Sequence, residues 1–184
     1  MMETLPSPAH DAGREPPEAP DALDSWVEAR LGRALTVAIL CRAGHVPSRL
    51  TRLASALASY GAFRVGTEQL PVDATEEHAQ ASLRKVAALA PDTLLICDTL
   101  PDADRWQAAW CVQVLRLADE AGLAERTFLA LIGTSVARAS ARRIGFEDGF
   151  DLGQDPAVIA RAIAREAVAG EEIRRCGSSP PCYL

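Results

Sequence analysis

A regular alternation between apolar, strand-like runs and amphipathic, helix-like segments constrains this chain more than any other feature. The strand-like runs are rich in Val, Ile, Leu and Phe, and the segments between them repeat apolar residues every three or four positions. Strands are predicted at 35–41, 63–67, 93–97, 127–132 and 148–151, and helices at 47–60, 75–90, 104–121, 135–144 and 155–169. Such an alternation favours a parallel sheet with right-handed helical crossovers.

The pattern predicts one α/β domain of the flavodoxin-like (Rossmann-like) class. We expect a doubly wound sheet of five parallel strands in the order 2-1-3-4-5, with helices on both faces. A chain of 184 residues with 48% hydrophobic content can bury one continuous core. In this order the ligand crevice lies outside the carboxyl ends of strands one, three and four. His45 and the segments 98–100 and 133–135 should therefore meet at one edge of the sheet.

Residues at the ends of the predicted helices support their boundaries. Thr75 and His78 occupy the N-cap and N3 positions of one helix, which makes His78 a solvated helix residue. Gly61 and Gly122 are expected to end helices, and Pro156 suits the first position of the last helix.

The N-terminal segment differs in composition from the rest of the chain. Residues 1–24 hold five prolines and few bulky apolar residues. This composition predicts a disordered, acidic leader, because little apolar surface is available to offset the entropy of ordering. Asp24 or Ser25 could cap a short helix that packs Trp26 and Leu31 on the domain. The expected divisions are a leader at 1–24, a short helix or linker at 25–32, the domain at 33–170 and a flexible tail at 171–184.

The distribution of charge argues against two classes of partner. The net charge of −6 comes largely from the first 30 residues, where acids outnumber Arg14 and Arg30. Because the remainder is nearly neutral, we expect no nucleic acid and no anionic membrane as a partner. No apolar run approaches the roughly 18 residues of a spanning helix, and the first residues lack the pattern of a signal peptide. A cytoplasmic location is therefore expected.

The five cysteines should be reduced in that compartment. Cys41, Cys97 and Cys111 fall within apolar patterns, so we interpret them as core thiols rather than reactive ones. Cys176 and Cys182 bracket a polar segment near the C-terminus. A redox or metal role for this pair is the alternative to a flexible tail, although two thiols alone do not complete a zinc site.

His45 is the most informative candidate ligand. It follows the predicted first strand, and no second histidine and no carboxylate lies within five residues of it. A metal site made by the protein alone is therefore not indicated, whereas one imidazole suits a cofactor that brings its own metal. A hydrolase is not indicated either, because Ser135 and Ser140 lack a G-x-S-x-G setting and Cys41 is expected to be buried.

Three segments at the expected crevice resemble the cobalamin-binding domains of mutases and methyltransferases that hold the cofactor base-off with a histidine. The family pattern is Asp-x-His-x-x-Gly after strand one, Ser-x-Leu after strand three and Gly-Gly after strand four. The corresponding segments here are Ala43-Gly44-His45-Val46-Pro47-Ser48, Asp98-Thr99-Leu100 and Gly133-Thr134. They keep the histidine, the leucine and the first glycine.

The resemblance covers roughly residues 33–170. Over 91–168 the chain is most similar to the small-subunit cobalamin domain of lysine 5,6-aminomutase and ornithine 4,5-aminomutase, particularly in the runs 117–123 and 142–153. The small subunit of glutamate mutase is similar in length and in its first βα unit.

The resemblance implies a cobalamin cofactor with His45 as the lower axial ligand of cobalt, in place of the cofactor's own benzimidazole. It favours adenosylcobalamin over methylcobalamin, and an isomerase of the aminomutase or mutase type. The displaced nucleotide tail would thread between the first strand, the helix at 47–60 and the Gly133 loop, where small residues allow close approach. No catalytic residue is implied. The residues placed at the cofactor are Gly44, His45, Val46, Ser48, Asp98, Thr99, Leu100, Gly133, Thr134, Phe150 and Gly153.

Four positions depart from the family pattern. Ala43 stands where the family has an aspartate that accepts the other ring N–H of the histidine, and the loss of such a partner costs about 10- to 100-fold in metal affinity or activity. Ser48 and Thr134 replace glycines and could narrow the tail channel. Asp98 replaces a serine; its place at the same sheet edge also makes it a candidate partner for His45, which the cobalamin affinity of Asp98→Asn would test.

Other functions stay open beside a cobalamin carrier. The departures favour a degenerate domain that no longer binds cobalamin and acts as an assembly or regulatory partner. A flavodoxin-like binder of another nucleotide or of a phosphorylation signal ranks lower, because 44–47 offers no glycine-rich phosphate cradle.

A cobalamin carrier would need a separate catalytic subunit as its partner. The chain has no room for a substrate barrel, and its only lysine, Lys85, lies on a helix face and not in a pyridoxal-phosphate motif. Trp106 and Trp110, four residues apart on one helix, are interpreted as core or subunit contacts.

Overall fold

A computed structural model describes residues 15–42, 48–71, 73–98, 104–134, 136 and 138–177, with only the backbone described at 98, 104–109, 176 and 177. Helices and strands alternate along these residues. In chain order they are α1 (Pro20–Leu31), β1 (Leu35–Arg42), α2 (Ser48–Ala58), β2 (Phe63–Leu70), α3 (Glu76–Ala88), β3 (Thr93–Asp98), α4 (Asp104–Glu120), β4 (Phe128–Gly133), α5 (Arg138–Ile144), β5 (Asp148–Asp151) and α6 (Pro156–Gly177).

The strands form one parallel sheet in the order β2-β1-β3-β4-β5, which confirms the predicted fold class and topology. β1, β3 and β4 occupy the centre, and their continuous apolar runs are buried because helices cover both faces. β2 is longer than predicted and pairs with β1 along its whole length, from Leu35 opposite Phe63 to Arg42 opposite Leu70.

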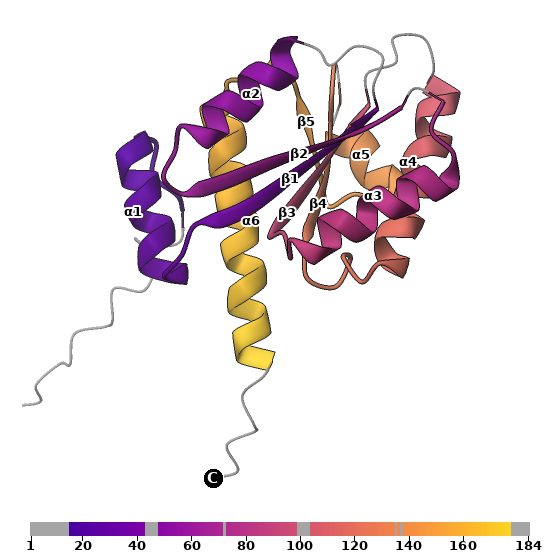
Figure 1. The fold of residues 1–184 in the computed structure, drawn as a ribbon. Helices are drawn as coiled ribbons and strands as arrows, with labels where there is room; N and C mark the ends of the chain where they lie inside the picture. Colours follow the sequence, from indigo (N-terminus) through magenta and orange to yellow (C-terminus); the bar gives the residue numbers. More distant parts are fainter. Residues whose placement is uncertain are drawn as a thin grey trace, which may run out of the picture.

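Helices lie on both faces of the sheet, with α1, α2 and α6 on one face and α3, α4 and α5 on the other (Figure 1). Successive strand residues point to opposite faces. On β1, Val37 and Ile39 therefore enter the core under α2 and α6, whereas Ala38 and Leu40 enter the core under α3 and α4. Among the described residues, no helix combines the length and apolarity needed to cross a membrane.

Several local predictions are confirmed. The Thr75 side chain accepts a hydrogen bond from the backbone N–H of His78 at 3.4 Å, and His78 is exposed. Gly122 takes the left-handed conformation, with φ of 69°, after the end of α4. Trp110 is buried in the core, whereas the side chain of Trp106 lies outside the described residues.

Cys41, Cys97 and Cys111 are buried, as predicted. Burial raises the pKa of the Cys41 thiol, which keeps it protonated and unreactive at neutral pH. The side chains of Cys176 and Cys182 lie outside the described residues.

The predicted start of the first helix was wrong. α1 begins at Pro20 and not near Ser25, so residues 20–24 belong to the fold and not to the leader. Proline is favourable at the first helical position, and Leu23 and Val27 bury completely against the core beneath α1. Asp24 lies inside the helix, so it is not the N-cap.

Asp24 instead stabilises the turn between α2 and β2. Its carboxylate accepts hydrogen bonds from the backbone N–H groups of Gly61 at 2.9 Å and Ala62 at 2.8 Å. α2 ends at Ala58. The expectation that Gly61 ends this helix as a left-handed cap was wrong, because Gly61 does not have a positive φ. A Cβ at Gly61 would lie 3.0 Å from the Asp24 carboxylate, so the glycine permits this close approach.

The last helix was also predicted too short. α6 continues to Gly177, beyond the predicted end at Ala169, so part of the expected flexible tail is helical. Its final turns are held by neighbouring segments. Arg174 donates to the carbonyl of Arg126 at 3.1 Å, and Arg175 donates to the carbonyl of Arg30 at 3.3 Å.

Candidate functional site

The carboxyl ends of four strands are aligned along one edge of the sheet. Cys41 pairs with Cys97, which places Arg42 beside Asp98. Asp98 in turn pairs with Gly133, and Gly133 pairs with Asp151. Residues 43–47, which include His45, lie outside the described residues and connect Arg42 at this edge to Ser48, the first residue of α2.

The predicted cofactor residues are divided between this edge, the core and segments that the structure does not describe. Ser48 is the exposed first residue of α2, and Thr134 is exposed directly after β4. Phe150 is buried, at 5% exposure, in the core under α2 and α6. Gly153 lies in the turn after β5. Gly44, His45, Val46, Thr99 and Leu100 lie outside the described residues.

The turn after β5 extends the sheet edge toward α2. The backbone N–H of Leu152 donates to the carbonyl of Gly133 at 2.9 Å, and the Asp151 carboxylate accepts from the backbone N–H of Gly153 at 2.6 Å. A Cβ at Gly153 would lie 2.9 Å from that carboxylate and 3.6 Å from Nη1 of Arg49. A side chain at this position would force the turn to move, so glycine is required by close packing.

A pocket of about 210 Å³ opens between the first turns of α2 and the β5–α6 turn. Leu53, Leu152 and Ile159 are buried and supply apolar surface to it. The complete lining is Arg49, Arg52, Leu53, Leu152, Gly153, Gln154, Pro156 and Ile159. The sequence reading missed Arg49 and Arg52. Their spacing of three residues, directly after the histidine segment, is the signal that could have indicated a basic helix face there.

Arg42 is a second residue that the sequence reading did not place at the edge. Its guanidinium lies over the ring of Trp110 on α4, 4.8 Å from the ring centroid. Such a cation–π contact joins the last residue of β1 to the helix that follows β3. The contact fixes the point from which residues 43–47 depart.

The position of β5 depends on a buried carboxylate. Both oxygens of Asp148 accept hydrogen bonds from the Arg138 guanidinium on α5. Burial alone would raise the pKa of Asp148, but the hydrogen bonds from Arg138 and from the backbone N–H of Gly149 more than compensate, so its pKa is lowered. The ionised pair holds β5 against α5 and thereby places Asp151 beside Gly133.

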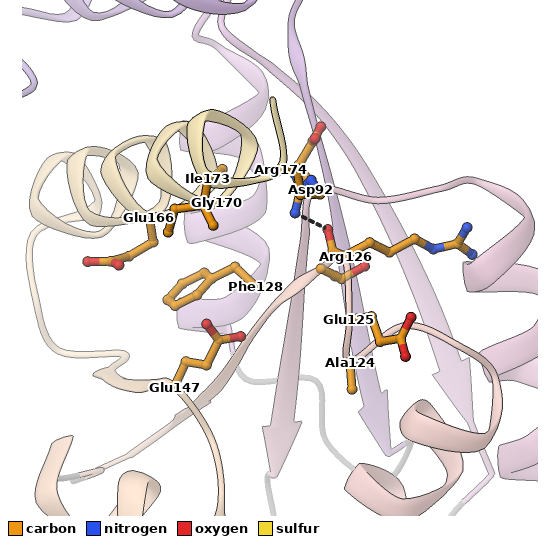
Figure 2. A pocket seen from close by; sticks show the side chains of 12 residues that line it. Asp92, Ala124, Glu125, Arg126, Phe128, Glu147, Glu166, Gly170, Ile173 and Arg174 are labelled. Carbon is orange, nitrogen blue, oxygen red and sulfur yellow. Dashed lines mark hydrogen bonds between the residues drawn. The ribbon is translucent and has the colours of Figure 1, made fainter. Parts of the chain in front are cut away.

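Another pocket, of about 200 Å³, lies at the opposite, amino edge of the sheet (Figure 2). Figure 2 shows Phe128 between Glu166 and Glu147, with Arg174 hydrogen-bonded to the carbonyl of Arg126. Asp92 also lines this pocket, and both of its oxygens accept from Arg33 at 2.7 Å.

Glu147 in the same pocket is tied to the main chain. Its carboxylate accepts from the backbone N–H of Leu129 at 3.0 Å. Although much of the side chain is exposed, partial burial of the carboxyl group raises its pKa. The Leu129 hydrogen bond opposes the rise, and the nearby charge of Glu166 adds to it. These polar groups hold segments of the fold together, and open α/β sheets bind ligands at the carboxyl edge. The carboxyl edge is therefore the candidate site.

Comparisons with known proteins bear on the fold. The chain matches no protein-family model and no curated protein at a significant level. Among solved structures it is similar to a cobalamin-binding protein from Desulfitobacterium hafniense DCB-2, with a TM-score of 0.56 and 13% sequence identity over 79% of this chain and 68% of that one. The monomethylamine corrinoid protein of Methanosarcina barkeri aligns with a TM-score of 0.49 and 16% identity over 79% of this chain and 63% of that one. The first of these similarities shows that the chain has the α/β fold also found in a cobalamin-binding protein.

Proposed function

We propose that this chain binds cobalamin base-off at the carboxyl edge of its sheet, with His45 as the lower axial ligand, and presents the cofactor to a separate catalytic subunit. The observation that carries the proposal is the alignment of the ends of β1, β3 and β4 at the origin of the His45 loop. The fold similarity to a cobalamin-binding protein supports the same cofactor class.

The residues at this edge fit a cofactor that needs one protein nitrogen and close backbone approach. No cluster of His, Cys, Asp and Glu that could hold a metal ion by itself occurs among the described residues. Gly133 ends β4, and glycine at position 153 lets the turn after β5 pack closely against Asp151 and Arg49, so no side chain projects from either position.

Each part of the edge has a role in the proposed complex. His45 would coordinate cobalt through a neutral imidazole nitrogen, and Asp98 would be the candidate acceptor for the other ring N–H in place of the family's aspartate. The nucleotide tail would lie between β1, α2 and the turns after β4 and β5. Bound cobalamin supplies the radical chemistry of an aminomutase or mutase in its adenosyl form, and this chain binds and orients it.

Titration with hydroxocobalamin and adenosylcobalamin, followed by visible absorbance, tests the proposal. The wild-type chain should bind with a spectral change, and His45→Gln should abolish that change and weaken binding by about tenfold or more. His78→Gln is the matched control, because glutamine at N3 preserves the cap of α3 and no effect on binding is expected. Absence of binding by the wild type would favour the scaffold that has lost its cofactor, and equal binding with the same spectral change in His45→Gln would contradict His45 as the cobalt ligand.

A further inference from the structure

The pocket between α2 and the β5–α6 turn carries positive charge that the fold does not use. Arg49 and Arg52 line it, both are exposed, and neither makes a hydrogen bond or ion pair with another described residue. Most other arginines of the described chain are engaged, as Arg138 is with Asp148. Two arginines at one pocket, with no partner in the described chain, are available to a ligand.

The lining of this pocket contains no carboxylate. The pocket at the amino edge mixes its arginines with Asp92, Glu125, Glu147 and Glu166. A groove of about 510 Å³ between α1 and α6 likewise includes Glu15 and Glu172, and Arg30 there is paired with Glu172 at 2.8 Å. In those two places arginines share the lining with the protein's own acids. At the α2 pocket the lining is cationic.

Two carboxylates lie near the pocket without lining it. Asp151 accepts from the backbone N–H of Gly153, and Asp155 accepts from the backbone N–H of Ala157 at the start of α6. The two carboxylates therefore accept hydrogen bonds from backbone N–H groups in the turn and at the start of α6. Arg49 and Arg52 form no ion pair with them.

The rest of the lining indicates what kind of anion would fit. Leu53 and Ile159 are almost fully buried, at 2% and 1% exposure, and form apolar surface beside the arginines. A planar guanidinium matches the oxygens of a phosphate group in a two-pronged arrangement, and apolar surface nearby favours an organic group attached to the phosphate. A volume of about 210 Å³ holds such a group and no large ring system.

We infer that Arg49 and Arg52 form a subsite for the phosphate of an organic phosphoester, with the attached organic group against Leu53 and Ile159. On the proposed function, this phosphate is the phosphodiester of the cobalamin nucleotide tail, and that assignment rests on cobalamin binding. The phosphate chemistry itself does not rest on it, because a free phosphate would meet the same two guanidinium groups.

The first experiment uses inorganic phosphate alone. Phosphate is added at constant ionic strength to the ¹⁵N-labelled full chain, and the Arg Nε–Hε signals and the Gly153 amide are followed by NMR. Saturable shifts at these positions are expected in the wild type and should be lost in Arg49→Gln/Arg52→Gln. The matched control, Arg64→Gln/Arg84→Gln, removes the same charge from two exposed arginines on β2 and α3 and should keep the shifts. Shifts that persist in the first double variant, or that never occur, would overturn the subsite.

The second experiment separates the two sources of phosphate. Cobinamide has the corrin ring but lacks the nucleotide tail and its phosphodiester. The wild type should bind cobalamin more tightly than cobinamide, and Arg49→Gln/Arg52→Gln should reduce that preference about tenfold or more with little change for cobinamide. Equal weakening for both corrinoids would refute the assignment to the tail. No corrinoid binding together with arginine-dependent phosphate shifts would refute the proposed function and leave a site for a free phosphoester.

Discussion

At the scale of single residues, the informative side chains are charged groups whose partners are main-chain atoms or distant residues. Asp24 holds the N–H groups of Gly61 and Ala62, and Asp148 is clasped by Arg138. No short-range sequence pattern predicts these hydrogen bonds, because each one joins residues that only the folded domain brings together. The sequence alone therefore suggests Asp24 or Ser25 as a helix cap.

Glu147 gives a prediction about pH dependence. Its pKa is raised in the folded chain, chiefly by burial, so the folded state binds this proton more tightly than the unfolded state. Its contribution to stability is therefore greatest below the ordinary glutamate pKa and is lost as pH rises through the raised value. Glu147→Gln should be more stable than the wild type at pH 7, by less than about 1 kcal/mol because the side chain is largely exposed.

Urea denaturation at pH 7 and pH 4 measures this difference. The gap between Glu147→Gln and the wild type should shrink toward zero at pH 4. Glu125→Gln, at an exposed residue of the same pocket, controls for the loss of one negative charge. A gap of the same size at both pH values, or a less stable variant at pH 7, would show that the Glu147 carboxylate is not held in an unfavourable setting.

At the scale of elements, the ends of helices differ most from the sequence prediction. α1 starts earlier than predicted because Pro20 suits a first helical turn and Leu23 and Val27 are buried beneath the helix. α6 runs on to Gly177 because its last turns are held by contacts that no local pattern reveals. Without those contacts, the glycine and polar residues of 170–177 have the composition of a flexible tail.

The last turns of α6 give a prediction about stability. Truncation after Ala169 removes the Arg174 and Arg175 hydrogen bonds to carbonyls of Arg126 and Arg30, as well as the Arg30–Glu172 ion pair. These contacts are mostly exposed, so the free energy of unfolding should fall by about 1–2 kcal/mol. Truncation after Gly177 is the control and should leave it unchanged. Equal stability of both truncated chains in chemical denaturation would mean that the last turns contribute nothing.

At the scale of the whole molecule, the fold could be predicted because its signal is repeated along the chain. Each apolar run, such as the one that ends at Cys41, is followed by a helix pattern, and handedness leaves few ways to connect them. The position of the candidate site follows from the same topology, since Asp98 and Gly133 end neighbouring strands.

The details of the site were less accessible to sequence. Arg49, Arg52 and Gly153 come from distant segments, and their approach depends on the register of β5 and the packing of α2 beside α6. Phe150, expected at the cofactor, is instead part of the core under α2 and α6. The alternation of side chains along a strand decides which face of the sheet Phe150 points to. A four-residue strand such as β5 is too short to show that alternation in the sequence.

The central claim is that a protein imidazole, from His45, is the axial ligand of cobalt. Electron paramagnetic resonance of the Co(II) form tests it directly, because the unpaired electron couples to the axial nitrogen. In a chain labelled with ¹⁵N-histidine and loaded with unlabelled cobalamin, the nitrogen splitting should change from a triplet to a doublet, and His45→Gln should remove the doublet. A triplet that persists in the labelled wild type would show that the cofactor's own benzimidazole stays on cobalt, and would contradict the account.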